Sequence, residues 1–234
     1  MEEGRFQEYL DSIVSRLKGE DPESVEKELK SLLPVLSFKK YEKLLSLLKE
    51  EKVLSAQQYE VLKKHYLVLN KYLMVYGISS RVFGEIWAIQ QLKTLDKGFK
   101  EPNKTFDPSF CGQYDLLFDN IKIGTRACRA VDIQEEGGRF DKALHYDSGK
   151  PFEMNFRQLR IESCEVIVLI GVWIDRLVYW VLSYNEIKDN KYFFHDKGKA
   201  EESLLVISDK NISDFDGYRA DEPQVMDVIL KKKS

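Results

Sequence analysis

The sequence predicts a helical domain followed by an α/β or α+β domain, and two observations carry that prediction. Over residues 1–77 the apolar side chains recur three and four positions apart, as they do along helices. From residue 78 onward, one more helix pattern is followed by a long loop and by short apolar runs bounded by turn residues, which is typical of strands. We therefore expect a helical N-terminal domain over residues 1–77 and an α/β domain over residues 78–234.

Capping signals delimit the helices of the first domain. Asp21 precedes Pro22, which suits a capping acid followed by a proline in the first helical turn. Ser55 with Gln58 forms a capping box, and we expect Gly77 to end the helix that Ser55 starts. That helix carries an apolar seam, for which we favour a bundle core over a subunit contact: Tyr59, Leu62, Tyr66, Leu69, Leu73 and Tyr76.

The second domain begins with a helix pattern over residues 81–93, where Glu85 stands beside a broad apolar side. Residues 94–113 have no periodicity and are rich in Gly, Pro, Lys and Asp, so we expect a long loop. A hairpin follows, and is described below. The later elements that we expect are a helix over residues 152–161 and strands over residues 165–174, 177–182, 204–208 and 225–230.

Composition and charge indicate an intracellular, cytoplasmic and water-soluble protein. The chain of 234 residues has a formal net charge of -3, so no global positive field attracts it to nucleic acid or to a membrane. Its three cysteines are widely spaced, which argues against a disulfide framework and against a structural zinc site. The longest apolar run, residues 166–174, is too short to span a bilayer, and the first residues lack the pattern of a secretory signal.

The stretch YDLLFDNIKIGTRACRA, residues 114–130, reads as two short strands joined by a two-residue turn at residues 119–120. Counting outward from the turn pairs Asp115 with Gly124. One face of the ribbon is then apolar and faces the core. The other face brings together an acid, two cations and a gap opposite the acid: Gln113, Asp115, Leu117, Lys122, Gly124, Arg126 and Cys128.

An acid on one strand facing an acid-x-lysine sequence on the next strand is the metal-binding arrangement of the PD-(D/E)xK nucleases, the superfamily of type II restriction endonucleases. The ribbon resembles that arrangement, and the segments FGEIWAI, FEMNFRQLR and CEVIVLIGVWIDRLVYWVLS extend the resemblance over residues 79–207. In such proteins the second strand reads something like IEVKAS, whereas this chain reads IGTRAC. Asp115 matches the first acid, Gly124 stands in place of the second acid, and Arg126 stands in place of the lysine.

The resemblance implies a restriction-endonuclease-like α/β core with a mixed central sheet flanked by helices. It also implies a double-stranded DNA partner, a possible homodimer and Mg²⁺-dependent phosphodiester hydrolysis when the site is intact. Gly124 supplies no carboxylate, and an arginine stays protonated and cannot act as a base, so catalysis should be crippled or absent. The implied metal ligands are Asp115 and Glu85, and the implied catalytic positions are Asp115, Gly124, Arg126, Glu85 and Gln158.

Several alternatives stay open. The two departures fit a natural loss of activity, a selected inactivation, or migration of the missing acid to Glu85, Asp119, Asp132 or Glu135. Asp115 also fits a solvated hairpin acid beside Lys122. Four arginines could meet phosphates, although scattered arginines at helix and strand edges usually make surface ion pairs instead: Arg126, Arg129, Arg157 and Arg160. A function of another class is a non-enzymatic helical interaction or assembly protein that uses the seam.

Overall fold

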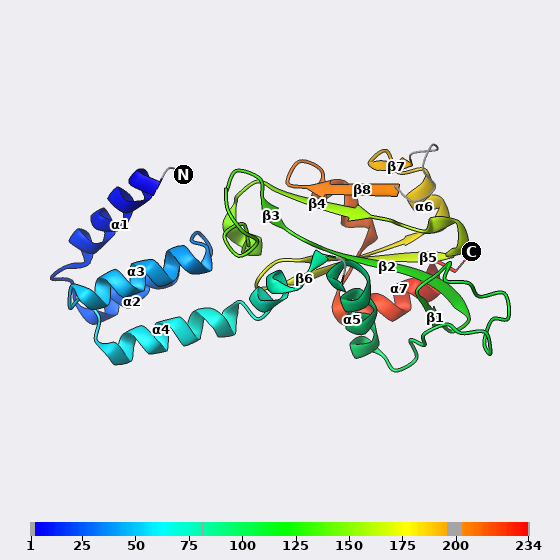
Figure 1. Cartoon of the computed structure of the whole chain (residues 1–234), viewed down its shortest axis with the longest axis horizontal. Helices are drawn as coiled ribbons and strands as arrows, with labels where there is room; N and C mark the ends of the chain where they lie inside the picture. Colours follow the sequence, from blue (N-terminus) through cyan, green and yellow to red (C-terminus); the bar gives the residue numbers. More distant parts are fainter. Residues whose placement is uncertain (1–2, 81, 196–202, 234) are drawn as a thin grey trace. The chain divides into compact units, whose positions relative to one another are not determined.

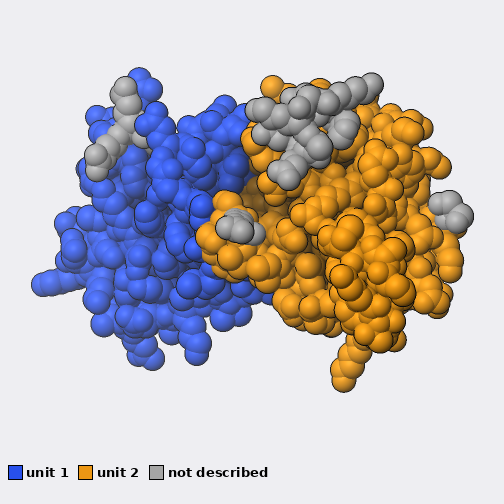
Figure 2. Space-filling view, turned by 45° about the vertical axis from the view of Figure 1, so that its right-hand side comes forward, with its two compact units in different colours: residues 1–77, 131–151, 173–176 blue, residues 78–130, 152–172, 177–234 orange. Residues whose placement is uncertain are grey.

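The computed structural model describes residues 3–80, 82–195 and 203–233, and Figure 1 shows their arrangement. The chain folds as two compact units (Figure 2). Unit 1 contains residues 1–77, 131–151 and 173–176, and unit 2 contains residues 78–130, 152–172 and 177–234. Two later segments thus belong to unit 1, where we had expected a single division after residue 77. Among the described residues, no helix is both long enough and apolar enough to cross a membrane.

Unit 1 is mainly helical, and its predicted caps are present. Asp21 accepts hydrogen bonds from the backbone N–H groups that begin the second helix, and Ser55 with Gln58 forms the capping box of the fourth. Leu10, Leu44 and Leu45 are fully buried between the packed helices. The elements are α1 (Glu3–Leu17), α2 (Pro22–Ser31), α3 (Phe38–Glu50), α4 (Ala56–Leu69), the 3-10 helices η1 (Leu73–Gly77) and η3 (Tyr146–Ser148), and β3 (Val131–Asp132).

The helix that Ser55 starts ends at Leu69, so the prediction that it continues to Gly77 was wrong. Asn70 ends it, because its backbone N–H and its side-chain Nδ2 both donate to the carbonyl of Tyr66, at 3.0 Å and 2.9 Å. A side chain that competes for a helical carbonyl in this way favours termination of the helix.

The apolar seam of α4 and η1 is mostly bundle core, as favoured from the sequence. Leu62, Tyr66, Leu73 and Tyr76 are at most 5% exposed. Leu69 departs from the pattern, because 44% of it is exposed. The chain turns between the end of α4 and the start of η1, so the residues of α4 and those of η1 do not follow one continuous helical repeat. A pattern that assumes one helix does not anticipate this turn.

Unit 2 is built on a mixed central sheet with the strand order β1-β2-β5-β6-β9. β1 and β2 are antiparallel, β2 and β5 are parallel, and the remaining pairs are antiparallel. Every residue of β5 is buried, as expected for a central strand covered on both faces. The strands are β1 (Leu116–Phe118), β2 (Ile121–Arg129), β5 (Val166–Val172), β6 (Leu177–Ser183) and β9 (Arg219–Ala220).

Helices cover one face of this sheet, and a second antiparallel sheet lies over the other (Figure 1). In unit 2 the second sheet contains β4 (Phe152–Arg157), β8 (Ser203–Ser208) and β7 (Phe193–His195), in that order. The π-helix η2 (Val82–Trp87) runs directly into α5 (Ala88–Leu95), and both pack on β2. The remaining helices are η4 (Ile161–Ser163), α6 (Tyr184–Lys188), η5 (Ile212–Tyr218), η6 (Glu222–Gln224) and α7 (Val225–Lys231).

The predicted strands at residues 165–174, 177–182 and 204–208 are confirmed as β5, β6 and β8. Arg81, the first residue of a predicted helix, lies outside the described residues, and the remainder of that helix is present as η2 and α5.

Two predicted elements were of the wrong type. Residues 152–161 were expected to be a helix, but they begin with β4, in which Phe152, Met154 and Phe156 alternate as buried residues. Residues 225–230 were expected to be a strand, but they form α7, in which Val225 and Ile229 are buried four positions apart. In both cases the surrounding structure sets the spacing of the buried residues, and that spacing decides whether the segment is a strand or a helix.

Candidate functional site

The candidate site is built around the hairpin of β1 and β2. Asp119 and Asn120 both adopt left-handed backbone conformations, with φ of 49° and 62°, as a two-residue type I′ turn requires. The predicted register is confirmed from this turn out to the pair of Leu116 with Ile123. Leu116, Ile121 and Ile123 are fully buried, so the apolar face of the ribbon is the core face.

Asp115 lies one residue before β1, and the simple pairing of the strands ends there. Its N–H donates to the carbonyl of Ile123 at 2.9 Å. The Asp115 carboxylate then takes the place of a backbone carbonyl as acceptor, because its Oδ2 accepts a hydrogen bond from the N–H of Thr125 at 2.8 Å. Only 7% of the Asp115 side chain is exposed, so it is a buried acid tied to the main chain of β2 and not a solvated one.

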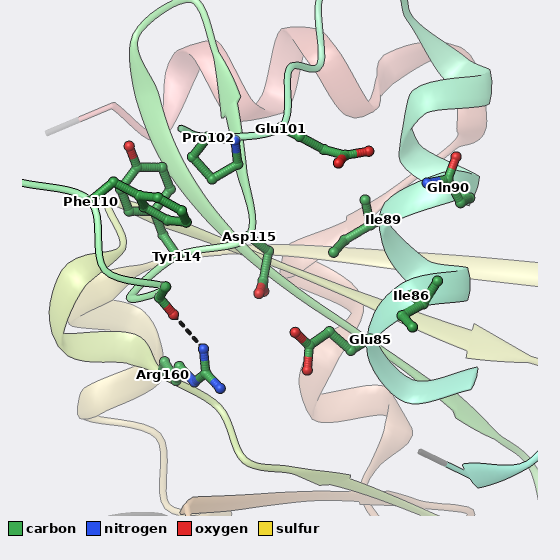
Figure 3. Close-up of a pocket in the computed structure, with 11 residues that line it drawn as sticks. Glu85, Ile86, Ile89, Gln90, Glu101, Pro102, Phe110, Tyr114, Asp115 and Arg160 are labelled. Atoms are coloured by element: carbon green, nitrogen blue, oxygen red, sulfur yellow. Dashed lines mark hydrogen bonds between the residues drawn. The ribbon is translucent and has the colours of Figure 1, made fainter. Parts of the chain in front are cut away.

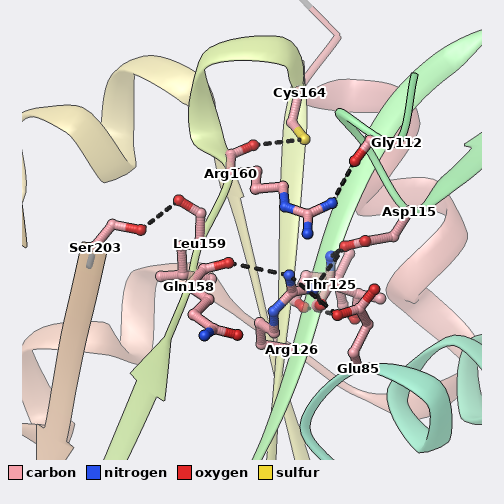
Figure 4. A network of polar contacts seen from close by, with 11 residues as sticks. Glu85, Gly112, Asp115, Thr125, Arg126, Gln158, Leu159, Arg160, Cys164 and Ser203 are labelled. Carbon is pink, nitrogen blue, oxygen red and sulfur yellow. Dashed lines mark hydrogen bonds and ion pairs between the residues drawn. The ribbon is translucent and has the colours of Figure 1, made fainter. Parts of the chain in front are cut away.

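Arg126 is the centre of the polar network (Figure 4). Its Nη1 donates to Asp115 Oδ2 at 2.9 Å and to the carbonyl of Thr125 at 2.6 Å. Its Nη2 donates to the carbonyl of Gln158 at 3.0 Å and lies 3.7 Å from Glu85 Oε2. The structure therefore brings three other predicted site residues, Asp115, Glu85 and Gln158, around the buried guanidinium of Arg126.

Gln158 takes part through its backbone. It follows β4 and has a left-handed φ of 57°, and its N–H donates to the carbonyl of Ser203 at 2.8 Å. This conformation directs the Gln158 carbonyl toward Arg126, while the Gln158 side chain is exposed. We had expected the side chain of Gln158 to lie beside the site on a helix. Instead the backbone carbonyl of Gln158, at the end of a strand, is the acceptor.

Glu85 is carried by the π-helix η2, an uncommon local structure that is often found at functional sites. Its side chain is 41% exposed, in contrast to the 7% of Arg126, so it forms the solvent side of the network. Figure 3 shows the carboxylates of Glu85 and Asp115 turned toward one another.

The gap expected opposite Asp115 at Gly124 is filled. A Cβ built on Gly124 would lie 3.0 Å from the Sγ of Cys164 and 3.7 Å from a side-chain carbon of Ile167. The Cys164 thiol donates to the carbonyl of Arg160 at 3.1 Å, which holds it in this position. An acid at position 124 therefore requires Cys164 to move or to be replaced.

A pocket of about 290 Å³ opens beside this network (Figure 3). Its polar lining includes Glu85, Asp115, Glu101 and Arg160, and its apolar walls include Phe110. Arg160 is one of the arginines that could meet a phosphate, and it donates to the carbonyl of Gly112, which also lines the pocket.

Cations accompany each of the acids of this pocket. Arg126 contacts both Asp115 and Glu85, and Lys93 contacts Glu101 at 2.6 Å. Because Arg160 adds a further positive charge to the lining, the three carboxylates do not make the pocket an anionic surface.

Burial controls the protonation of the buried groups. It raises the pKa of the Asp115 carboxyl, and the charge of Arg126 and the N–H of Thr125 oppose that rise. Burial likewise raises the pKa of the Cys164 thiol to about 12, so the thiol stays protonated at neutral pH. Cys164 is thus a space-filling donor beside the network and not a nucleophile.

The residues present do not fit Mg²⁺. Magnesium needs several oxygen ligands in octahedral geometry. Here Gly124 offers no carboxylate, and Asp115 Oδ2 already accepts two hydrogen bonds. Across the described residues, no group of three or more His, Cys, Asp and Glu side chains could hold a metal ion. The predicted ligands Asp115 and Glu85 do lie together, but a guanidinium contacts both.

Comparisons with protein-family models, with curated proteins and with solved structures found no match to this chain. Its residues and their geometry therefore carry the functional argument.

The remaining candidates lie elsewhere. Arg129 is buried, its Nη2 donates to the carbonyl of Ile78 at 2.6 Å, and its guanidinium stacks on Phe83. These contacts give Arg129 a structural role within unit 2. Asp119 lies in the hairpin turn, away from the network.

The other two candidates for a migrated acid belong to unit 1. There Asp132 contacts Lys150 and Glu135 contacts Lys40. Both carboxylates have ion-pair partners within unit 1.

Sequence reasoning missed two contributors, Thr125 and Cys164. Thr125 was placed on the core face, and its hydroxyl does donate into the core, to the carbonyl of Val168 at 2.9 Å. Its backbone N–H, which no side-chain pattern can reveal, serves Asp115. Cys164 reaches Gly124 only because β5 lies parallel to β2, and the sole available signal was the small residue at position 124, which leaves room for a neighbour.

Proposed function

We propose that this chain is a restriction-endonuclease-like DNA-binding protein whose phosphodiester hydrolysis is crippled or absent with Gly124 and Arg126 in its sequence. One observation carries the proposal: Asp115, Glu85 and Arg126, the residues that the resemblance selects, converge at the edge of one pocket. The mixed central sheet, with helices over one of its faces, is in keeping with it.

The chemistry of the site supports loss of hydrolysis. The resemblance to the PD-(D/E)xK nucleases implies that hydrolysis needs two carboxylates that bind a metal ion and a lysine near the attacking water. An arginine cannot act as a base as a lysine can, and the Arg126 guanidinium already serves Asp115 and two backbone carbonyls. Glycine at position 124 removes the second carboxylate. The Arg160 guanidinium in the pocket lining suits contact with a phosphate backbone rather than its cleavage.

Binding to duplex DNA is the first test. Fluorescence anisotropy with a labelled duplex should give an affinity that falls steeply between about 50 mM and 200 mM KCl, because phosphate neutralisation releases counterions. The matched competitor is heparin, which should displace the duplex. An affinity that does not change with salt, or no binding at low salt, would contradict the proposal.

Restoration of cleavage is the second test. The variant should combine Gly124→Glu and Arg126→Lys with Cys164→Ala, because the Cys164 thiol lies 3.0 Å from the position of a new Cβ. With Mg²⁺ or Mn²⁺ this triple variant should nick plasmid DNA, and the same variant with Asp115→Asn should not. Brisk cutting by the unmodified protein would defeat the prediction of crippled catalysis. A folded, DNA-bound triple variant that does not cut would count against an ancestral hydrolase.

The alternative, a helical assembly protein, is favoured by one observation. Two valines of α4 are apolar and exposed, Val61 at 59% and Val68 at 65%. Leu62 is buried, so Leu62→Asp would test folding rather than assembly. A stable dimer that Val61→Asp with Val68→Asp abolishes, in a protein that binds no DNA, would favour this alternative.

A further inference from the structure

The place between the two carboxylates of the candidate site is filled by a positive charge that belongs to the protein. Arg126 Nη1 lies 2.9 Å from Asp115 Oδ2, and Arg126 Nη2 lies 3.7 Å from Glu85 Oε2. A cation bound by these two acids would have to lie in the same space. The guanidinium and an added cation therefore exclude one another, both sterically and by charge.

The guanidinium is held there by the main chain. Backbone carbonyls of Thr125 and Gln158 accept hydrogen bonds from Nη1 and Nη2. Gln158 is itself fixed, because its left-handed backbone is tied to the carbonyl of Ser203. A side chain that is only 7% exposed and bonded on three sides does not leave its place easily.

We propose that Arg126 takes the place of a divalent cation in this site, so that the chain meets a DNA phosphate without needing such an ion. The part that concerns DNA rests on the proposed function. A pair of carboxylates without a counter-charge repels a phosphate and must recruit a cation before the phosphate can approach. Here the counter-charge is covalently part of the chain, and arginine keeps it at any working pH.

The first test compares the DNA affinity of the unmodified protein in EDTA and in Mg²⁺ at equal ionic strength. We expect the two dissociation constants to agree within about twofold. A twofold ratio corresponds to less than half of the binding free energy of about 1.4 kcal/mol that a tenfold ratio represents. Binding that appears only with Mg²⁺ overturns the inference and leaves the proposed function standing. This comparison needs no variant, so it does not depend on the folding of a mutant.

The second test measures the cation directly and without DNA. Mn²⁺ alone is titrated into the protein, and free Mn²⁺ is followed by electron paramagnetic resonance. Up to about 1 mM Mn²⁺, the range of weak carboxylate sites, the unmodified protein should bind none at this site. Arg126→Gln should gain a Mn²⁺ site, and Arg126→Gln with Asp115→Asn should lose it again. Mn²⁺ bound by the unmodified protein and released by Asp115→Asn alone overturns the inference, as does an Arg126→Gln variant that gains no Mn²⁺ site.

The variant also links the two tests. In EDTA, Arg126→Gln should bind duplex DNA roughly tenfold or more weakly than the unmodified protein, because Asp115 and Glu85 then repel the phosphate without a counter-charge, and Mn²⁺ should restore the affinity. The matched control is Arg157→Gln, which makes the same charge change at an exposed arginine on the end of β4. It should gain no Mn²⁺ site and no cation dependence.

The two failures are distinguishable. Duplex DNA that binds in neither buffer removes the proposed function, and the Mn²⁺ titration then decides by itself whether Arg126 holds the place of the cation. Circular dichroism of each variant checks that its fold is intact.

Discussion

Replacement of Arg126 by methionine should destabilise unit 2 strongly, because it leaves the Asp115 carboxylate buried without its cation. Only 7% of each side chain is exposed, so solvent screens the pair little. Removal of one partner from a buried ion pair costs about 3–5 kcal/mol. Since folded domains have only about 5–15 kcal/mol of stability, this is a large fraction of the total. The N–H of Thr125 remains as a partner of Asp115 and places the expected loss at the lower end of the range.

The loss should depend on pH, and its direction follows from Asp115. Burial raises the pKa of this carboxyl in the folded protein, so the folded state holds its proton more tightly than the unfolded state does. The associated stability is present below the unfolded pKa of Asp115 and is lost as the pH rises through the folded pKa. Without Arg126, which lowers this pKa, the folded pKa rises further. The destabilisation by Arg126→Met should therefore be larger at pH 8 than at pH 5.

Urea unfolding followed by circular dichroism at both pH values measures the effect. The matched variant is Asp115→Asn with Arg126→Met, in which no buried charge is left and most of the lost stability should return. A loss below about 1 kcal/mol at pH 8, an equal loss at both pH values, or a double variant that is less stable than Arg126→Met would each refute the reasoning.

Three further predictions concern packing, capping and thiol reactivity. Gly171→Ala should lower the free energy of unfolding by about 1–3 kcal/mol, because the new Cβ would lie 2.7 Å from the Trp180 ring. The control is Gly217→Ala, whose new Cβ meets nothing within 4 Å. Equal denaturation midpoints for the two variants would contradict this prediction. Ser55→Ala should remove the cap of α4, which lowers the free energy of unfolding by about 1 kcal/mol and lowers the denaturation midpoint. Ser37→Ala should change this midpoint little, because the Ser37 hydroxyl makes no hydrogen bond within the described part of the chain. Thiol titration at pH 8 should label the exposed Cys111 rapidly and Cys164, whose pKa burial raises to about 12, only after denaturation; similar rates would be the opposing result.

The ribbon shows how far local sequence information reaches. The two-residue turn at Asp119-Asn120, the register beyond it and the meeting of Asp115 with Arg126 were all predictable. Each depends on steric preferences of a few residues or on alternation counted from one turn. The capping residues Asp21 and Ser55 were predictable for the same reason, since a cap acts within one helical turn.

Elements with mixed patterns were not predictable from the sequence. Residues 152–161 contain apolar residues both at strand spacing and at helix spacing, and the buried alternation in β4 was selected by its pairing with β8. Residues 225–230 form a short apolar run, which fits either type of element. Such segments take the period of the surface against which they pack.

The sequence by itself determined the hairpin, its register and the starts of the capped helices, because all of these follow from interactions among near neighbours in the chain. Only the tertiary structure decided that Cys164 fills the space beside Gly124, that the Gln158 carbonyl receives Arg126, and that one guanidinium contacts Asp115 and Glu85 together. These contacts join segments that are distant in sequence, and side-chain patterns do not encode backbone carbonyls or the volume left by a glycine.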